Sequence, residues 1–125
     1  MKKITSKKNN NNLEKILLNI IDFLEDNKAQ NVVSLSLKDK SNEADYMIIA
    51  SGNSKRQVSS LSEKLVEFSK INLNKKARTE GLRNSDWVLI DFGDIVVNIF
   101  REEVRDFYDL EKIWNSKNFK NKKEK

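Results

Sequence analysis

The chain has 125 residues, enough for one domain with a modest hydrophobic core. It contains no cysteine and no histidine, which excludes disulfides, thiolate metal sites and histidine-dependent nucleophile pairs. Its net charge is +5. No apolar run approaches the roughly 20 residues that span a bilayer, and the basic start lacks the apolar stretch of a signal peptide. We therefore expect a cytoplasmic protein that does not enter a membrane.

The positive charge is concentrated at the two ends of the chain. Residues 1–12 carry four lysines and no acid, and residues 115–125 carry five lysines and one glutamate, so the segment between them has a net charge of −3. Both ends are rich in Asn and Lys, a composition that favours disorder. We expect disordered basic tails at 1–12 and 116–125 around one domain at 13–115. The alternative function for these lysines is a weak hold on RNA.

The first half of the domain predicts a helix, two strands and a second helix. Residues 13–28 have an apolar stripe at helical spacing, with Asn12 as the expected N-cap. Residues 33–37 alternate like a half-buried strand, and 46–50 form an apolar run typical of a strand covered on both faces. Ser54 is placed to cap the helix that follows. Lys55 and Arg56 leave anion binding at this helix start as an alternative, although a simple cap is favoured.

The second half of the domain contains the strongest strand signals. Residues 75–80 suit a polar edge strand, and residues 81–85 suit a loop. Residues 87–92 and 95–100 predict a hairpin whose two-residue turn is Gly93 and Asp94. This turn sets the register, which places one wholly apolar set of side chains on the core face. The other face is mixed and pairs Trp87 with Phe100, Leu89 with Asn98, and Asp91 with Val96. That face is either ordinary core under a helix or a surface kept for a partner.

The final segment, residues 101–115, predicts a closing helix. Glu102 and Glu103 lie in its first turn, where the helix dipole favours anions. Tyr108 lies on the shoulder of the apolar stripe, and Glu111 lies within the stripe, where a carboxylate needs a partner. The predicted stripe consists of Val104, Phe107, Leu110 and Trp114. The order α-β-β-α-β-β-β-α predicts an α/β single domain with a mixed β-sheet flanked by helices.

Acidic residues are frequent near the C-terminal end of the domain. Between Asp86 and Glu111 there are eight acids and two bases, a net charge of −6. Such a segment favours a basic protein surface as partner, and the alternative is an ordinary solvated helix face. Asp91 and Asp94 could share a magnesium ion, whereas Asp86 lies roughly 16 Å along the strand from Asp91 and could not join them.

Three separated segments of the chain resemble the ribosomal silencing factor (Iojap-like) family. The first is residues 45–54 (DYMIIASGNS), the second is Glu80 and Gly81 followed by residues 86–97 (DWVLIDFGDIVV), and the third is residues 101–114. The resemblance covers about residues 13 to 115. It implies a fold related to the nucleotidyltransferases, without their catalytic site and without a cofactor.

The resemblance also implies a partner and a mode of action. Members of the family bind the large ribosomal subunit through its fourteenth-numbered intersubunit-face protein, block the joining of the small subunit and so repress translation, with a link to ribosome biogenesis. The resemblance implies a monomer on the ribosome and allows a homodimer when the protein is free. Contact of the lysine tails with ribosomal RNA would be weak.

The predicted partner-binding residues combine the resemblance with the hairpin geometry. The family pattern implicates Trp87 and Tyr108 in the contact, with Asp91, Asp94 and Glu111 as contributors. Asn98 and Phe100 join the set because they share the mixed face with Trp87. Asn98 stands where the family commonly has histidine, and its amide can donate a hydrogen bond but cannot titrate.

Two further hypotheses belong to other function classes. A residual nucleotidyltransferase would use Asp91 and Asp94 with magnesium and would require several carboxylates beside a phosphate-binding loop. An RNA-binding module would act through the lysine tails. A steric repressor requires no chemistry, and the sequence favours it.

Overall fold

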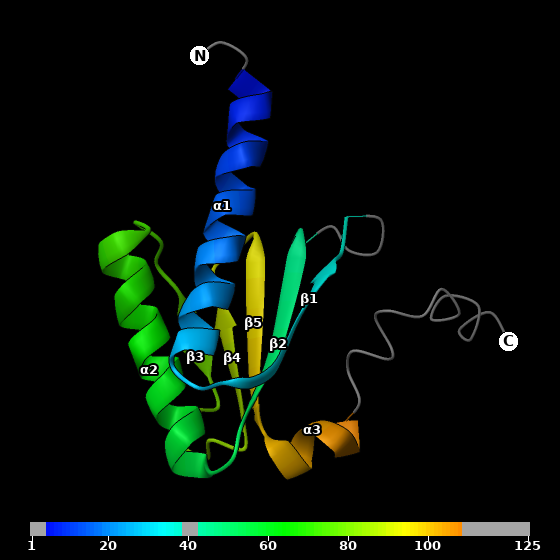
Figure 1. Ribbon diagram of the computed structural model, residues 1–125, viewed down its shortest axis with the longest axis vertical. Coiled ribbons are helices and arrows are strands. Elements are labelled where there is room, and N and C mark those ends of the chain that lie inside the picture. The colour runs from blue at the N-terminus through cyan, green and yellow to red at the C-terminus, as the bar shows by residue number, and fades with distance from the viewer. Residues whose placement is uncertain (1–4, 39–42, 109–125) are drawn as a thin grey trace, which may run out of the picture.

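The structure is a computed structural model that describes residues 5–38 and 43–108, with side chains described for residues 12–38 and 43–105. One five-stranded mixed sheet, in the order β1-β2-β5-β4-β3, carries two long helices on one face (Figure 1). This confirms the predicted single α/β domain with a mixed sheet, while the relation to nucleotidyltransferases stays a prediction. The elements are α1 (Thr5–Asp26), β1 (Gln30–Ser36), β2 (Tyr46–Gly52), α2 (Lys55–Asn72), β3 (Arg78–Glu80), β4 (Trp87–Asp91), β5 (Ile95–Arg101) and α3 (Glu102–Tyr108).

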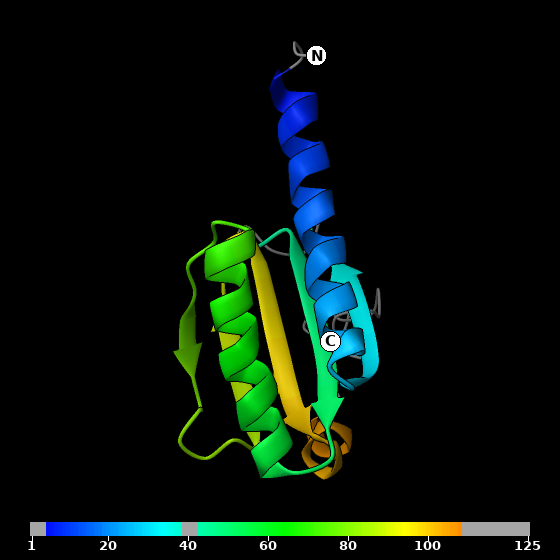
Figure 2. The same ribbon diagram turned by 60° about the vertical axis from the view of Figure 1, so that its left-hand side comes forward.

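The helices α1 and α2 lie side by side over the sheet, and the short α3 lies at the end where β2 and β5 finish (Figure 2). Among the described residues, no helix is long and apolar enough to cross a membrane. The predicted edge strand is confirmed as β3, although it has only three residues.

The start of α1 differs from the prediction. The helix begins at Thr5, so Asn12 lies within it and the predicted N-cap at Asn12 is wrong. Residues 5–12, which we expected to be disordered, form its first turns, whereas the predicted tail at 116–125 lies outside the described residues. The apolar stripe starts at Leu13 because it marks only the part of the helix that packs on the sheet. The backbone continues beyond that contact, where α1 projects past the sheet (Figure 1).

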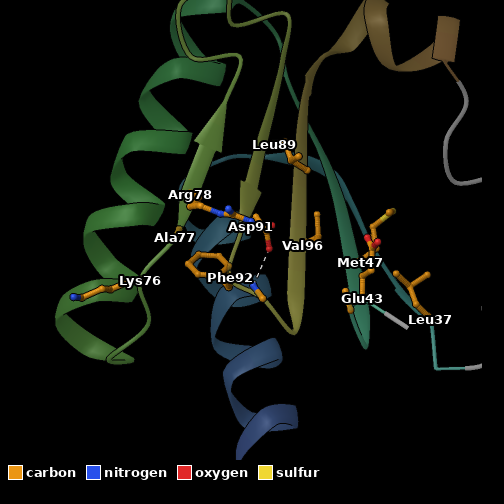
Figure 3. Close-up of a pocket in the computed structure, with 12 residues that line it drawn as sticks. Leu37, Glu43, Met47, Lys76, Ala77, Arg78, Leu89, Asp91, Phe92 and Val96 are labelled. Atoms are coloured by element: carbon orange, nitrogen blue, oxygen red, sulfur yellow. Dashed lines mark hydrogen bonds and ion pairs between the residues drawn. The ribbon is translucent and has the colours of Figure 1, made fainter. Parts of the chain in front are cut away.

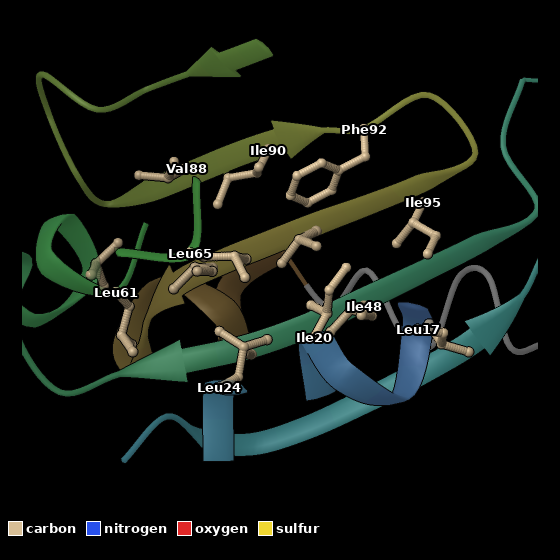
Figure 4. Packing of buried hydrophobic residues seen from close by; sticks show 14 residues of the cluster. Leu17, Ile20, Leu24, Ile48, Leu61, Leu65, Val88, Ile90, Phe92 and Ile95 are labelled. Atoms are coloured by element: carbon tan, nitrogen blue, oxygen red, sulfur yellow. The ribbon is translucent and has the colours of Figure 1, made fainter. Parts of the chain in front are cut away.

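The main core lies between the sheet and the two long helices (Figure 4). All six side chains on the apolar face of the hairpin belong to it, as predicted: Val88, Ile90, Phe92, Ile95, Val97 and Ile99. Burying each aliphatic or aromatic side chain contributes roughly 1.5–3 kcal/mol. The helices supply Ile20 and Leu24 from α1 and Val58, Leu61 and Leu65 from α2, so the predicted apolar stripes of both helices face the sheet.

The hairpin register agrees with the prediction at every pair, from Trp87 opposite Phe100 to Asp91 opposite Val96. Phe92 N–H donates to the Ile95 carbonyl at 2.9 Å, which closes the two-residue turn. On the far side of the sheet, a second and smaller cluster contains Leu37, Met47, Ile49 and Phe100. The prediction that β2 is covered on both faces is therefore confirmed. Among the described helices, only α3 packs on this second cluster, through Val104.

We predict that two glycines differ sharply in their tolerance of a side chain. Gly81 and Gly93 both have positive φ, of 92° and 99°. An added Cβ at Gly93 meets nothing within 4 Å, whereas at Gly81 it would lie 2.2 Å from the Trp87 carbonyl oxygen. Gly93→Ala should therefore cost about 1–3 kcal/mol of unfolding free energy from backbone strain, and Gly81→Ala should cost more. Urea denaturation of both variants tests this, and equal losses would contradict it.

Candidate functional site

On the face of the β4–β5 hairpin that points away from α1 and α2, the partly buried Trp87 rests on two buried residues. Trp87 is half-buried, its indole Nε1 donates to Asn98 Oδ1 at 2.8 Å, and its ring stacks on Phe100 with the centroids 4.8 Å apart. Phe100 is fully buried and Asn98 is 2% exposed. The three predicted residues are thus brought together, and Trp87 is the partly exposed member of the three. Asn98 and Phe100 hold it in place.

The Asn98 side chain has a defined orientation because indole N–H groups only donate. Its oxygen must face Trp87, which directs its Nδ2 the other way. Nδ2 is buried and has no hydrogen-bond partner among the described residues. Leaving a buried donor unpaired costs about 1–3 kcal/mol. Asn98 therefore fixes the tryptophan at some cost in stability.

A groove of about 1020 Å³ lies on the same side of the sheet, toward the hairpin turn (Figure 3). Its floor is apolar and its rim carries both signs of charge, with Glu43 near β2 and Lys76 and Arg78 near β3. The apolar lining consists of Leu37, Ala44, Met47, Ala77, Leu89, Phe92 and Val96. Sequence reasoning missed the rim residues and Met47, because they come from distant segments that only the sheet order brings together.

The acids at the end of β4 and in the hairpin turn are paired with cations from β3 and from the segment that leads into it. Asp91 Oδ2 accepts from Arg78 Nη2 at 3.3 Å, and its Oδ1 accepts from Gly93 N–H at 2.8 Å. Both carboxylate oxygens of Asp94 accept from Lys75 Nζ, at 3.2 and 3.1 Å. The predicted excess of negative charge is therefore partly balanced here, because a count along residues 86–111 omits the cations that fold against them.

Asp86 and Arg101 join the start of β4 to the end of β5, next to the stacked pair Trp87 and Phe100. Arg101 Nε donates to Asp86 Oδ1 at 2.8 Å, and Arg101 N–H donates to the Asp86 carbonyl, also at 2.8 Å. The hydrogen bond from Arg101 holds the pKa of Asp86 below its ordinary value of 3.8, against the opposing effect of desolvation. The same contact raises the pKa of Arg101. Arg101 also pairs with Glu103 in the first turn of α3.

The magnesium alternative has no support in the part of the chain that the structure describes. Asp91 and Asp94 bind different cations, Arg78 and Lys75. No group of three acidic, histidine or cysteine residues suited to a metal occurs within residues 5–38 and 43–108.

The start of α2 has the simple cap that the sequence favours. Ser54 Oγ accepts from Gln57 N–H at 3.1 Å, and Gln57 Oε1 accepts in turn from Asn53 N–H. Lys55 donates to Asn84 Oδ1 and lies 3.8 Å from Asp86. The predicted N-cap is therefore confirmed.

The remaining predicted partner-binding residues lie near or beyond the end of the described chain. Tyr108 is the last residue of α3, and its side chain is outside the described part. Glu111 lies outside the described residues, as do Leu110 and Trp114 of the predicted stripe. Val104 is the stripe residue whose packing is described, and it packs on the cluster that contains Phe100.

Comparisons with known proteins give one consistent family. Residues 10–125 match the family described as "Ribosomal silencing factor during starvation". The chain is 45% identical to a ribosomal silencing factor of Zymomonas mobilis over 101 residues, covering 81% of this chain and 76% of that protein. It is 38% identical to one from Halalkalibacterium halodurans, covering 81% and 86%. It is also 27% identical to the mouse protein named mitochondrial assembly of ribosomal large subunit protein 1, covering 80% and 45%.

Two solved structures share the fold. A crystal structure of a Chromobacterium violaceum protein superposes with a TM-score of 0.78 at 32% identity, covering 83% of this chain and 87% of that chain. A crystal structure of a Bacillus halodurans protein superposes with a TM-score of 0.72 at 35% identity, covering 81% and 94%.

We predict that Asp86→Asn destabilises the protein at neutral pH but not in strong acid. Because folding lowers the pKa of Asp86, its carboxylate stabilises the fold above the unfolded pKa, and this contribution is lost as the pH falls through the lower folded pKa. The difference in melting temperature between wild type and variant should thus be largest near pH 7 and shrink below pH 3.8. A difference that is the same at pH 7 and pH 2.5 would contradict this assignment.

Proposed function

The chain belongs to the ribosomal silencing factor family, and from that premise we propose that it represses translation by occupying the large ribosomal subunit so that the small subunit cannot join. The proposed contact is the fourteenth-numbered protein of the intersubunit face. The observation that carries this proposal is the half-buried Trp87, held on Phe100 and Asn98 beside an apolar groove. The mouse relative, named for assembly of the large ribosomal subunit, supports the choice of subunit.

The proposed mechanism is steric and needs no catalytic group. A protein interface of ordinary size covers about 800 Å² on each partner, and a few aromatic anchors supply most of its affinity. Trp87 would be the anchor, and the groove toward the hairpin turn would take apolar side chains of the ribosomal protein. The rest of the domain, including the two long helices on the opposite face, would then occupy space that the small subunit requires.

The charged groups around the anchor would guide the approach of the partner. The Arg78 side chain is 86% exposed and its pair with Asp91 is long, so a basic group of the ribosomal protein could replace it. Asp94 has a closer partner in Lys75. Tyr108 and Glu111, which follow Arg105 in the chain, stay proposed contributors to the contact. A weak contact of the lysine tails with ribosomal RNA, and the homodimer of the free protein, stay predictions.

We predict that Trp87→Ala weakens binding to large subunits by about 30-fold, since truncation of an aromatic anchor costs about 2 kcal/mol or more. Co-sedimentation of the purified protein with isolated large subunits measures the affinity. Circular dichroism and a melting curve establish that the variant is folded.

The matched control is Ile71→Ala. Ile71 is a large apolar residue that is 67% exposed on α2, on the opposite side of the sheet. It should bind as the wild type does. If a folded Trp87→Ala variant binds large subunits as tightly as the wild type and Ile71→Ala do, Trp87 is not the anchor.

A second measurement tests the consequence of binding. Wild-type protein added to separated subunits should lower the fraction of joined ribosomes in a sucrose gradient, whereas Trp87→Ala should have little effect at the same concentration. If the wild type binds large subunits and the joined fraction is unchanged, the steric mechanism is wrong even though the partner is right.

A further inference from the structure

Arg105 is a buried cation that ties α3 to two strands. The residue is only 7% exposed. Its Nη1 donates to the Asn31 carbonyl at 2.7 Å and to Ser51 Oγ at 2.8 Å. Burying a charge costs several kcal/mol unless hydrogen bonds and charges compensate it, and these two bonds contribute to that compensation. What the guanidinium adds is direction, because its donors form a rigid planar fork.

The local backbone at Asn31 and the burial of Ser51 place both acceptors near Arg105. Asn31 has a φ of 51° and lies where the pairing of β1 with β2 shifts between Gln30 and Val33. A bulge of this kind removes a residue from the regular ladder and re-aims its backbone groups. The Asn31 carbonyl accepts from Arg105. Ser51 is fully buried and pairs with Gln30 on one side and Phe100 on the other. The contact thus converges on the end of the sheet beneath α3.

The helix α3 depends on such contacts for its position. It has seven residues and starts at Glu102, directly after β5 ends at Arg101. Isolated helices shorter than about 12–15 residues are marginal in water, so contacts with the sheet contribute to the direction of the described part of α3. Val104 packs on the cluster that contains Phe100, and Arg105 donates hydrogen bonds to β1 and β2.

We propose that Arg105 is a positioning residue for docking: it fixes α3 so that the helix and the Trp87 side of the hairpin form one surface toward the large subunit. This inference rests on the proposed function. It assigns Arg105 no contact with the partner. It also gives the Asn31 carbonyl and the Ser51 hydroxyl a shared role, as acceptors that orient the helix.

The test uses Arg105→Lys, which keeps the charge but loses the fork, and Ser51→Ala, which removes one acceptor. Arg56→Lys, the same change at an exposed position of α2, is the control. We expect Arg105→Lys to lower large-subunit affinity about tenfold and Ser51→Ala by a smaller factor, because hydrogen bonds to a charged group are lost. Arg56→Lys should bind like the wild type.

Hydrogen exchange separates positioning from a general loss of stability. Amides of residues 102–108 should exchange faster in Arg105→Lys, while amides of β2 and β5 keep their wild-type protection. Equal loss of protection throughout the sheet would mean that Arg105 acts only through global stability and would overturn the inference. Faster exchange in α3 with wild-type affinity would also overturn it, because α3 would then not take part in docking.

The same experiment distinguishes this inference from the proposed function. If wild-type protein does not bind large subunits, the proposed function fails, and a role of Arg105 in that docking fails with it. If the wild type binds and Arg105→Lys binds equally well, the inference alone fails. Retention of wild-type affinity by Arg56→Lys, together with weaker binding by Arg105→Lys, supports the positioning role.

Discussion

The register of the β4–β5 hairpin decides what the rest of the molecule can do. Side chains alternate between the two faces of a strand, so a slip of one residue would send the apolar set outward and the Trp87 set into the core. Two features oppose such a slip: the short turn with Gly93 at a positive φ, and the burial of six apolar side chains against α1 and α2. The same packing that stabilises the fold therefore also defines the outward face.

On the outward face of the hairpin, buried residues hold a partly exposed one. Phe100 and Asn98 are buried and hold Trp87 by stacking and by a hydrogen bond. A tryptophan restrained in this way loses little conformational freedom when a partner covers it, which favours affinity. Within residues 5–38 and 43–108, Asn98 Nδ2 has no hydrogen-bond partner, so the contact with Trp87 carries a cost in stability. The proposed steric mechanism requires a firm contact with the partner and no reactive group, and a restrained tryptophan is suited to such a contact.

Features of the fold that depend on neighbouring residues could be predicted from the sequence. Features that depend on contacts between distant segments could not. The hairpin register, the Ser54 cap and the double-sided burial of β2 follow from residues within a few positions of one another, and the structure confirms them. The predicted start of α1 is wrong because an apolar stripe marks the part of a helix that packs and not the full length of the helix. Arg105 could not be linked to Asn31 from sequence, because neither the bulge nor the approach of α3 has a local signal. The roles of Tyr108 and Glu111 stay predictions.

The acids show why a count of charges along the chain misjudges a surface. Asp86 has a close, well-aligned partner in Arg101, and both side chains are less than one-third exposed, so this pair is part of the scaffold that holds β4 to β5. Asp91 pairs at longer distance with an Arg78 side chain that is 86% exposed. Such a surface pair contributes only about 0–1 kcal/mol. An incoming cation can replace Arg78 at Asp91 at little cost, whereas replacing Arg101 would loosen the support of Trp87. Among acids that look alike in the sequence, Asp91 is thus suited to recognition and Asp86 to structure.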